Sequence, residues 1–169
     1  AYYPELDTVA HRHGVASTQA ANRLAAIDAA FAQLLKRLSG TSTVVIVSAD
    51  HGFIDTPASH ALELENYPGL VELLRLPLTG EPRVAYCHVK PGCTERFIAR
   101  AREIFGDRAD VRISTELIAE GWFGSGTAHP RLADRIGDVT LLMREHYTIK
   151  DHLPGEKRHL LIGNHGGIT

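Results

Sequence analysis

Apolar residues recur at the helical period near the start of the chain, in residues 17–38. Leu24, Ile27 and Phe31 are three and four positions apart, so they would share one face of an α-helix. Gly40 follows, and glycine commonly stands just after the last turn of a helix. The pattern predicts a long helix over residues 17–38 that ends at Gly40.

Residues 43–48 carry a different pattern, the continuous run TVVIVS, in which β-branched residues predominate. Apolar side chains would point to both faces of a strand here, so the run predicts a strand buried on both sides, as in a parallel sheet. A helix that leads into such a strand indicates the α/β class. We therefore expect part of a mostly parallel sheet flanked by helices.

The chain changes character after this predicted strand, where prolines and short alternating patterns predominate. Within residues 59–136 we predict a strand over 83–89, a helix over 93–105, a strand over 111–114 and a helix over 115–120. We interpret this stretch as a small inserted α/β subdomain. A strand over 138–143 and the apolar run 160–162 are expected to return the chain to the core, which would consist of residues 1–58 and 137–169.

The composition limits the classes of partner. With 44% hydrophobic and 22% charged residues, the 169-residue chain can bury the core of one domain. Its formal net charge of −2 lacks the basic footprint of a protein that binds nucleic acid duplexes. No apolar stretch is long enough to cross a bilayer and no leader opens the chain, so we expect no membrane attachment and slightly favour the cytoplasm. A part that precedes Ala1 could still carry a leader.

Histidine occurs with a carboxylate or amide side chain in three short segments, which are Asp7-x-x-x-His11, Asp50-His51-Gly52 and Asn164-His165-Gly166-Gly167. Taken alone, the first is commonly a solvent-exposed pair on a helix, and the last an ordinary glycine turn. The middle segment is more informative, because it directly follows the predicted buried strand. Ligands of open α/β sheets bind at the carboxyl ends of the strands.

This mixture of side chains suits a two-metal phosphoryl-transfer site. Zn²⁺ takes nitrogen from histidine and oxygen from aspartate, and two such ions about 4 Å apart can hold the attacking and leaving oxygens of an in-line displacement. Negative charge spreads over the equatorial oxygens of the transition state of a phosphate ester, where cations stabilise it.

In this order, the three segments resemble the type I phosphodiesterase/nucleotide pyrophosphatase family of the alkaline phosphatase superfamily. The matching stretches are YPELDTVAHRHG at residues 3–14, VSADHGF at 47–53 and GNHGGIT at 163–169. The resemblance runs from end to end, although residues 60–135 carry no recognisable family motif. It implies that the chain is the C-terminal part of an alkaline-phosphatase-like catalytic domain.

The resemblance also implies the roles of individual residues. Asp7, His11 and His165 would hold one metal, and Asp50 and His51 would hold the other. The family's second metal site also uses an Asp and a Thr or Ser nucleophile, which lie upstream of the segment that matches Asp7. The catalytic nucleophile would therefore lie outside this chain, in an N-terminal half of the same protein.

Several consequences follow from this implied division of the site. A longer parent protein would hydrolyse a small phosphate ester or nucleotide with two divalent metals, zinc being the first choice. The isolated chain would be inactive, because it lacks the nucleophile. It would also bind zero or one metal, because the site of Asp50 and His51 is incomplete.

Some residues are set aside at this stage. His13 lies beside His11 but points elsewhere on a turn, which favours a solvated role. His60 remains a weak candidate for substrate binding, because it follows the Asp50 segment closely. Trp122 and Phe123 could form an aromatic lip over a substrate, although packing within the subdomain is the commoner role of such residues.

Alternative functions remain open. Phosphonate hydrolases, cofactor-independent phosphoglycerate mutases and sulfatases of the same superfamily share the metal scaffold. Cys87 and Cys93 match no zinc or disulfide framework and lie outside the C-x-P-x-R setting of a sulfatase, so we expect two buried or idle thiols. A non-catalytic α/β binding module, in which the acid and imidazole groups serve only structure, is the alternative from another class.

Overall fold

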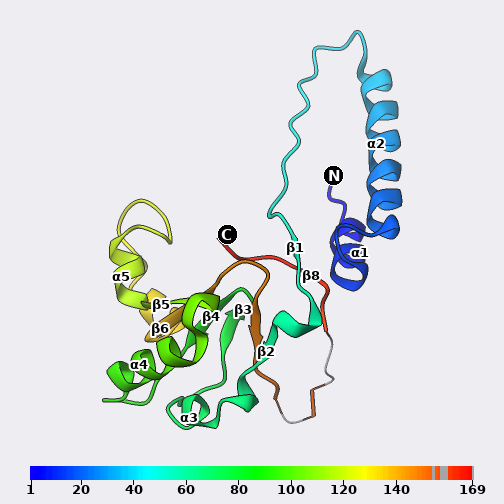
Figure 1. Ribbon diagram of the computed structural model, residues 1–169. Helices are drawn as coiled ribbons and strands as arrows, with labels where there is room; N and C mark the ends of the chain where they lie inside the picture. Colours follow the sequence, from blue (N-terminus) through cyan, green and yellow to red (C-terminus); the bar gives the residue numbers. More distant parts are fainter. Residues whose placement is uncertain (154, 157–159, 169) are drawn as a thin grey trace. The chain divides into compact units, whose positions relative to one another are not determined.

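The computed structural model describes residues 1–153, 155–156 and 160–168. The chain divides into two compact units. The first comprises residues 1–55 and 161–165, and the second comprises residues 56–160 and 166–169. Each unit has its own helices and paired strands (Figure 1). The predicted division at residues 58/59 and 136/137 stays a prediction about the whole protein.

The first unit begins with two helices, α1 (Glu5–His13) and α2 (Thr18–Leu38), which pack against each other. Ser17 caps α2, since its side-chain oxygen accepts a hydrogen bond from the Ala20 amide at 3.1 Å. The long helix that the apolar spacing predicts is thus confirmed, within one residue at each end. None of the described helices combines the length and apolarity that crossing a membrane requires.

The first unit also contains two short strands, β1 (Ile54–Asp55) and β8 (Gly163–Asn164), which pair antiparallel. In an antiparallel pair the two chains run in opposite directions, so the residues before β1 lie beside those after β8. This pairing brings the Asp50-His51 segment and His165 to the same end of the strand pair.

The prediction of a buried strand over residues 43–48 is wrong for this chain. The segment is irregular and exposed, with 83% of Val44 and 88% of Ile46 accessible to solvent. A strand exists only where a neighbouring main chain pairs with it, and among the described residues no ladder forms with this segment. The apolar side chains of this segment favour burial, but no described part of the chain buries them.

The second unit is built on a four-stranded antiparallel sheet with the order β3-β4-β6-β5. The strands are β3 (Thr79–Glu81), β4 (Val84–Cys87), β5 (Ala109–Ile113) and β6 (Val139–Met143). Every residue of β6 is buried, so both faces of this interior strand are covered. The predicted strands over 83–89, 111–114 and 138–143 are confirmed in position.

Two further strands of this unit, β2 (Ala61–Glu63) and β7 (Thr148–Lys150), form a parallel pair. The helices of the second unit are α3 (Pro68–Val71), α4 (Thr94–Phe105), α5 (Ser114–Ala119) and α6 (Leu132–Ile136), with 3₁₀ turns at Ala58–His60, Leu64–Asn66 and Gly106–Arg108. The helices predicted over 93–105 and 115–120 are confirmed. The apolar run 160–162 is not itself a strand, and β8 begins directly after it.

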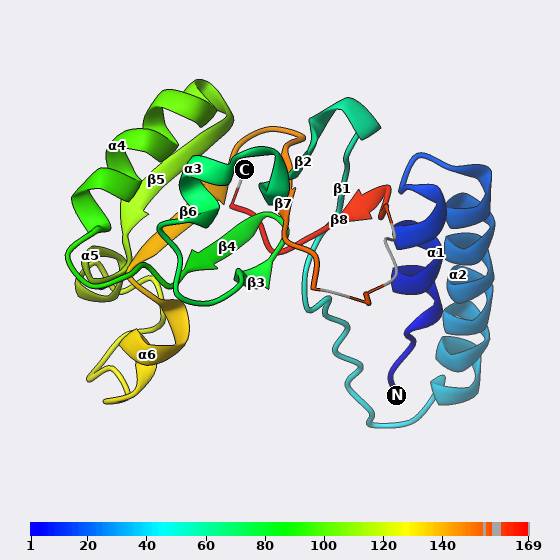
Figure 2. The same ribbon diagram turned by 90° about the horizontal axis from the view of Figure 1, so that it is seen from below.

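The hydrophobic core of the second unit lies between α4 and the four-stranded sheet (Figure 2). Phe97 and Phe105 of α4 are fully buried against the strands, whose own core residues include Val111 and Leu141. Cys87 belongs to the same core, and burial raises the pKa of its thiol well above the ordinary value. Both cysteines are free, as predicted, and Cys87 is unreactive in this environment.

Candidate metal centre

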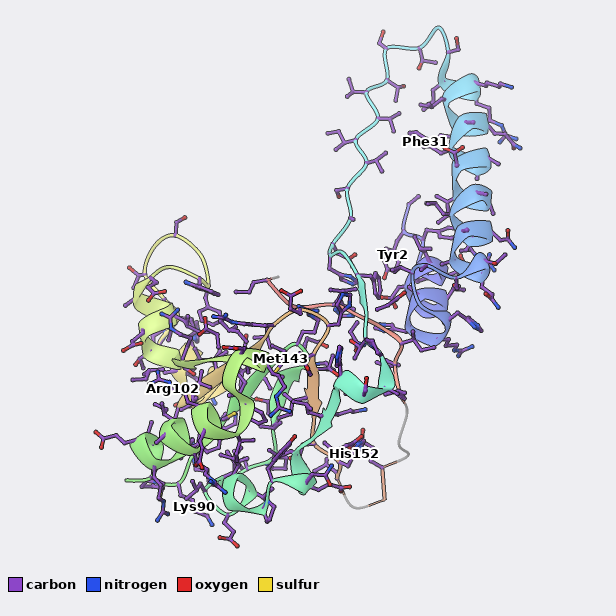
Figure 3. The ribbon with its side chains drawn as sticks, in the orientation of Figure 1. Tyr2, Phe31, Lys90, Arg102, Met143 and His152 are labelled. Atoms are coloured by element: carbon purple, nitrogen blue, oxygen red, sulfur yellow. The ribbon has the colours of Figure 1, made fainter. Side chains whose placement is uncertain are left out.

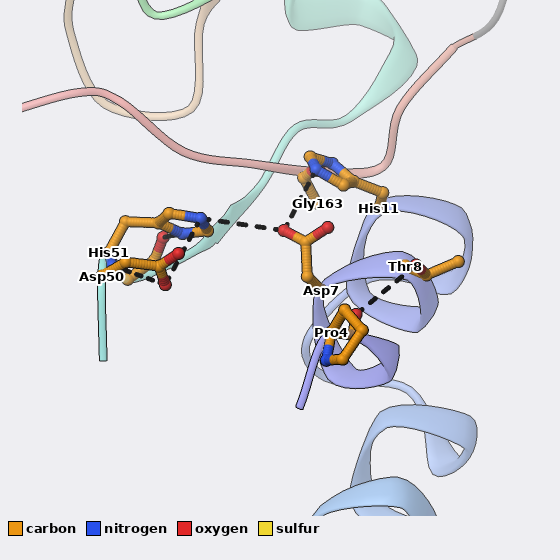
Figure 4. Close-up of polar contacts among 8 residues, drawn as sticks. Pro4, Asp7, Thr8, His11, Asp50, His51 and Gly163 are labelled. Atoms are coloured by element: carbon orange, nitrogen blue, oxygen red, sulfur yellow. Dashed lines mark hydrogen bonds and ion pairs between the residues drawn. The ribbon is translucent and has the colours of Figure 1, made fainter. Parts of the chain in front are cut away.

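Helix α1 presents two of the predicted ligands on one face. Asp7 and His11 are four residues apart, which places them one above the other on a helix. The His11 Nε2 atom lies 3.4 Å from Asp7 Oδ1 (Figure 4). The side chains are 21% and 39% exposed respectively, so this pair lies at an accessible surface and is not enclosed in a core.

The segment before β1 contributes His51 to the same carboxylate. Its Nε2 atom lies 3.8 Å from Asp7 Oδ1 and 3.7 Å from Asp50 Oδ1 (Figure 4). One oxygen of Asp7 therefore faces the imidazoles of both His11 and His51. Asp50 lies at the edge of this arrangement, with a side chain that is 71% exposed.

Backbone carbonyls determine which ring nitrogen of these histidines is available. The His11 Nδ1 atom lies 2.8 Å from the carbonyl oxygen of Gly163, and the His51 Nδ1 atom lies 3.2 Å from that of Gly52. A carbonyl oxygen can only accept, so each Nδ1 carries the proton and donates it. In each ring, Nε2 faces the carboxylates, and the neutral form with the proton on Nδ1 would offer its Nε2 lone pair to a metal, as metal-binding histidines commonly do.

His165 completes the arrangement from the segment after β8. Its ring stacks on that of His51, with centroids 3.9 Å apart and planes at 19°, and its centroid lies 5.1 Å from that of His11. Asp7, His51 and His165 each offer one ligand atom, and these atoms all lie within 4.8 Å of one another. We call these three residues the ligand cluster. It combines residues that the sequence assigns to two different metals, and that assignment stays a prediction.

Phe53 is a site residue that the sequence analysis did not single out. Its ring makes T-shaped contacts with the rings of His11, His51 and His165, with centroid distances of 5.2, 5.0 and 5.4 Å. An apolar ring in this position restricts how far the imidazoles can turn. Its only signal in the sequence is its place directly after Asp50-His51-Gly52.

Close backbone contact holds the segment of His165 against helix α1. The Ile162 amide donates to the carbonyl oxygen of His11 at 2.9 Å. A Cβ atom built on Gly163 would lie only 2.4 Å from the carbonyl oxygen of Ala10, so glycine is required at this position. The contact brings a segment from the far end of the sequence onto the helix that carries Asp7 and His11.

Asp55 of β1 accepts hydrogen bonds from the turn that follows helix α1. Its two carboxylate oxygens accept hydrogen bonds from the amides of Val15 and Ala16, at 2.7 and 3.2 Å. Gly14, just before them, has a positive φ of 83° and ends α1. The strand that follows His51 is thus joined to the turn that follows His11.

A comparison with models of protein families shows which family the chain belongs to. The model of the type I phosphodiesterase/nucleotide pyrophosphatase family matches residues 1–168. The chain belongs to this family. The resemblance that the three motif segments carry is thereby confirmed over nearly the whole chain, and no curated protein matches it significantly.

Solved structures support the fold of this family member. Murine ectonucleotide pyrophosphatase/phosphodiesterase 5 has a TM-score of 0.71 and 21% identity, and the human protein of that name has 0.72 and 18%. Phosphonoacetate hydrolase from Sinorhizobium meliloti, in complex with phosphonoacetate, has 0.66 and 22%. Each match covers 96% of this chain and 41% of the other chain. The α/β fold class is confirmed, and the chain spans about two fifths of the length of these structures.

Other candidate residues of the family member lie outside the ligand cluster. His13 is exposed, in agreement with its predicted solvated role. His60 belongs to the second unit, where its ring lies 4.3 Å from that of Tyr147, and its role in substrate binding stays a prediction. Trp122 and Phe123 are 43% and 39% exposed, so an aromatic lip also stays a prediction.

Replacing Gly163 by alanine is expected to disrupt the contact between β8 and α1. The added Cβ would meet the Ala10 carbonyl, so the segment of His165 must move, and we expect a loss of about 1–3 kcal/mol in the free energy of unfolding. Urea denaturation measures this loss. Gly52→Ala is the matched control, because nothing lies within 4 Å of its Cβ position. Equal stability of the two variants would contradict the close contact.

Proposed function

We propose that this chain supplies the metal ligands, but not the nucleophile, of a metal-dependent phosphoric ester hydrolase. Asp7, His11 and His165 would hold one divalent metal, and Asp50 and His51 the other. The observation that carries the proposal is the convergence of Asp7, His51 and His165, whose ligand atoms lie within 4.8 Å of one another. The Thr or Ser nucleophile and a further Asp ligand would come from an upstream part of the same protein.

The donor set supports zinc as the metal. Carboxylate oxygen and neutral imidazole nitrogen are the donors that zinc accepts at such sites, and the Nδ1 hydrogen bonds to Gly163 and Gly52 leave Nε2 available on His11 and His51. When bound, the metals would stabilise negative charge on the oxygens of the ester. Asp7 would hold the imidazoles of His11 and His51 in position, because one of its oxygens faces both.

Phe53 would also help to orient the proposed ligands. Phe53 contacts three imidazole rings and limits their rotation, which keeps the ligand atoms oriented before a substrate arrives. The partly exposed Asp7 and His51 leave room for a ligand to approach from solvent. A small substrate would therefore meet an arrangement that is already in place.

The proposed substrate is a small phosphate ester or a nucleotide. The name of the family supports this class, and one solved structure is an inactive variant of the murine protein in complex with AMP. The likeness to phosphonoacetate hydrolase keeps a phosphonate as the second candidate. The residues that would discriminate these substrates are proposed to lie with the nucleophile, outside this chain.

The test is an assay of two proteins from the same gene. We expect the longer protein to hydrolyse a nitrophenyl phosphodiester in a metal-dependent manner, and the 169-residue chain to show no hydrolysis above background. Zinc titration by calorimetry should give two ions for the longer protein and zero or one for the chain alone, since one site lacks ligands. Robust metal-dependent hydrolysis by the chain alone, or a longer protein that chelation does not affect, would overturn the proposal.

A further inference from the structure

Asp55 joins strand β1 to the turn between helices α1 and α2, and all of these elements belong to the first unit. Its Oδ1 and Oδ2 atoms accept hydrogen bonds from the amides of Val15 and Ala16, at 2.7 and 3.2 Å. Both amides directly precede Ser17, the N-cap of α2. The N-terminus of a helix favours negative charge, and hydrogen bonds to a carboxylate are roughly twice as strong as those between neutral groups. Asp55 therefore ties β1 to both helices.

Gly14, where α1 ends, packs directly on the same carboxylate. A Cβ atom built on Gly14 would lie 2.8 Å from Asp55 Oδ2 and 3.0 Å from Asp55 Cγ. No side chain at position 14 therefore separates the end of the helix from the carboxylate. The contact sets the spacing between the end of α1 and strand β1.

The pair of strands β1 and β8 is attached to α1 at a second point. Asp55 is paired with Gly163 of β8, whose carbonyl oxygen lies 2.8 Å from His11 Nδ1 (Figure 4). The Ile162 amide donates to the carbonyl oxygen of His11 at 2.9 Å. One attachment would leave the strand pair free to swing about that point. Two attachments, at Asp55 and at His11, fix both its distance from α1 and its direction.

The ligand cluster spans this joint between α1 and the strand pair. Asp7 lies on α1, His51 lies shortly before β1, and His165 directly follows β8. Their ligand atoms lie within 4.8 Å of one another. A swing of the strand pair would carry both imidazoles away from the Asp7 carboxylate. Metal–ligand distances tolerate deviations of only about 0.2 Å, so a metal would sense a small displacement at this joint.

We propose that Asp55 is a positioning residue of the metal centre, which fixes the strand pair against α1 and so holds His51 and His165 at a metal-binding distance from Asp7. It touches neither metal nor substrate. The inference rests on the proposed function, in which the members of the ligand cluster bind metal. Asparagine has the same shape as aspartate, but its amide nitrogen can only donate, so it can keep at most one of the two hydrogen bonds.

Hydrogen exchange tests the attachment without any metal. In the 169-residue chain, Asp55→Asn is expected to accelerate the exchange of the Val15 and Ala16 amides by about 10-fold or more, because these amides donate to the Asp55 carboxylate. The Ala20 amide, which donates to the side chain of Ser17 at 3.1 Å, is the internal reference and should exchange as before. Circular dichroism checks that the fold is retained.

Zinc affinity tests the positioning role in the longer protein. Asp55→Asn is expected to raise the dissociation constant for zinc about 10-fold or more, which is the usual effect of losing a group that orients metal ligands. Asp28→Asn is the matched control and should change the constant less than about two-fold. Asp28 is exposed on α2, three residues before Phe31, which Figure 3 labels in the half of the helix that lies away from α1. Phe97→Leu, in the core of the second unit, should lower stability without changing zinc affinity.

Gly14→Ala tests the same joint from the opposite side and keeps the carboxylate. Its Cβ would displace Asp55, so zinc should again bind more weakly. Gly92→Ala is its matched control. The two glycines have similar positive φ angles, 83° and 75°, but nothing lies within 4 Å of the Cβ position of Gly92. Backbone strain is thus common to both variants, and the contact with Asp55 belongs to Gly14→Ala alone.

The proposal is wrong if Asp55→Asn leaves the exchange of the Val15 and Ala16 amides unchanged. It is also wrong if their exchange accelerates but zinc binds as tightly as before, while His165→Ala weakens zinc binding. Asp55 would then have a structural role only. If His165→Ala leaves zinc affinity unchanged as well, the proposed function itself fails and the positioning role fails with it.

Discussion

Replacing Asp7 by alanine in the longer protein is expected to lower kcat/KM for phosphodiester hydrolysis by more than about 100-fold, with the fold retained. The size follows from the position of this carboxylate, which lies 3.4 and 3.8 Å from the Nε2 atoms of His11 and His51. In the proposed function Asp7 is a metal ligand; loss of an outer partner of such a ligand already costs about 10–100-fold, so loss of Asp7 should cost more. Asp7 is 39% exposed, so its removal leaves no deeply buried group without a partner.

His165→Ala is expected to have a similar effect on hydrolysis, because His165 stacks on His51 within the ligand cluster. The controls are Glu5→Ala, an exposed acid on the same helix as Asp7, and His13→Ala, an exposed histidine near the end of that helix. Steady-state kinetics, zinc titration and circular dichroism should be measured together. Unchanged function of Asp7→Ala and His165→Ala, with folding retained, would favour the non-catalytic binding module.

A second large effect is expected on stability, from Phe97→Ala in the second unit. Phe97 is fully buried in the core between α4 and the four-stranded sheet, so truncation removes a large apolar contact and leaves a cavity. The expected loss is about 3–5 kcal/mol in the free energy of unfolding, measured by urea denaturation of this unit. Phe97→Leu, which keeps more of the volume, should lose clearly less.

Phe123→Ala is the matched control for this truncation, because the same residue type is 39% exposed there. We expect its stability to remain within about 0.5 kcal/mol of the unsubstituted chain. A loss as large as that of Phe97→Ala would mean that the aromatic residues near the end of α5 belong to the core. A negligible loss for Phe97→Ala would contradict the core position of α4.

Local patterns predicted three of the helices, α2, α4 and α5, and three strands of the second unit, β4, β5 and β6, but not α1 or the shorter elements. The spacing of Leu24, Ile27 and Phe31 indicates a helix because the backbone hydrogen bonds of a helix join residues four apart, and α2 follows that prediction. The same holds for α4, whose buried Phe97 and Phe105 share one face. The prediction from the β-branched run at 43–48 was wrong because a strand, unlike a helix, needs hydrogen bonds to another segment. Its preference for a buried strand is local, but the strands that would satisfy it are not among the described residues.

The types of the site residues were also determined by the sequence alone. Three segments, two that combine aspartate and histidine and one with asparagine beside histidine, identified Asp7, His11, Asp50, His51 and His165 as candidates, and their order indicated the family. The spacing of Asp7 and His11 even predicts that they are neighbours, because a helix brings residues four apart together. No local rule, however, relates these residues to a histidine more than a hundred positions away.

Only the tertiary structure decided how the candidates meet. The pairing of β1 with β8 brings His51 beside His165, and the His11–Gly163 hydrogen bond joins residues 152 positions apart in the sequence. The tertiary structure also revealed the contacts of Phe53 and the need for glycine at position 163, since both depend on atoms from distant segments. Sequence spacing determines contacts within a helix, whereas contacts between segments depend on which surfaces pack together.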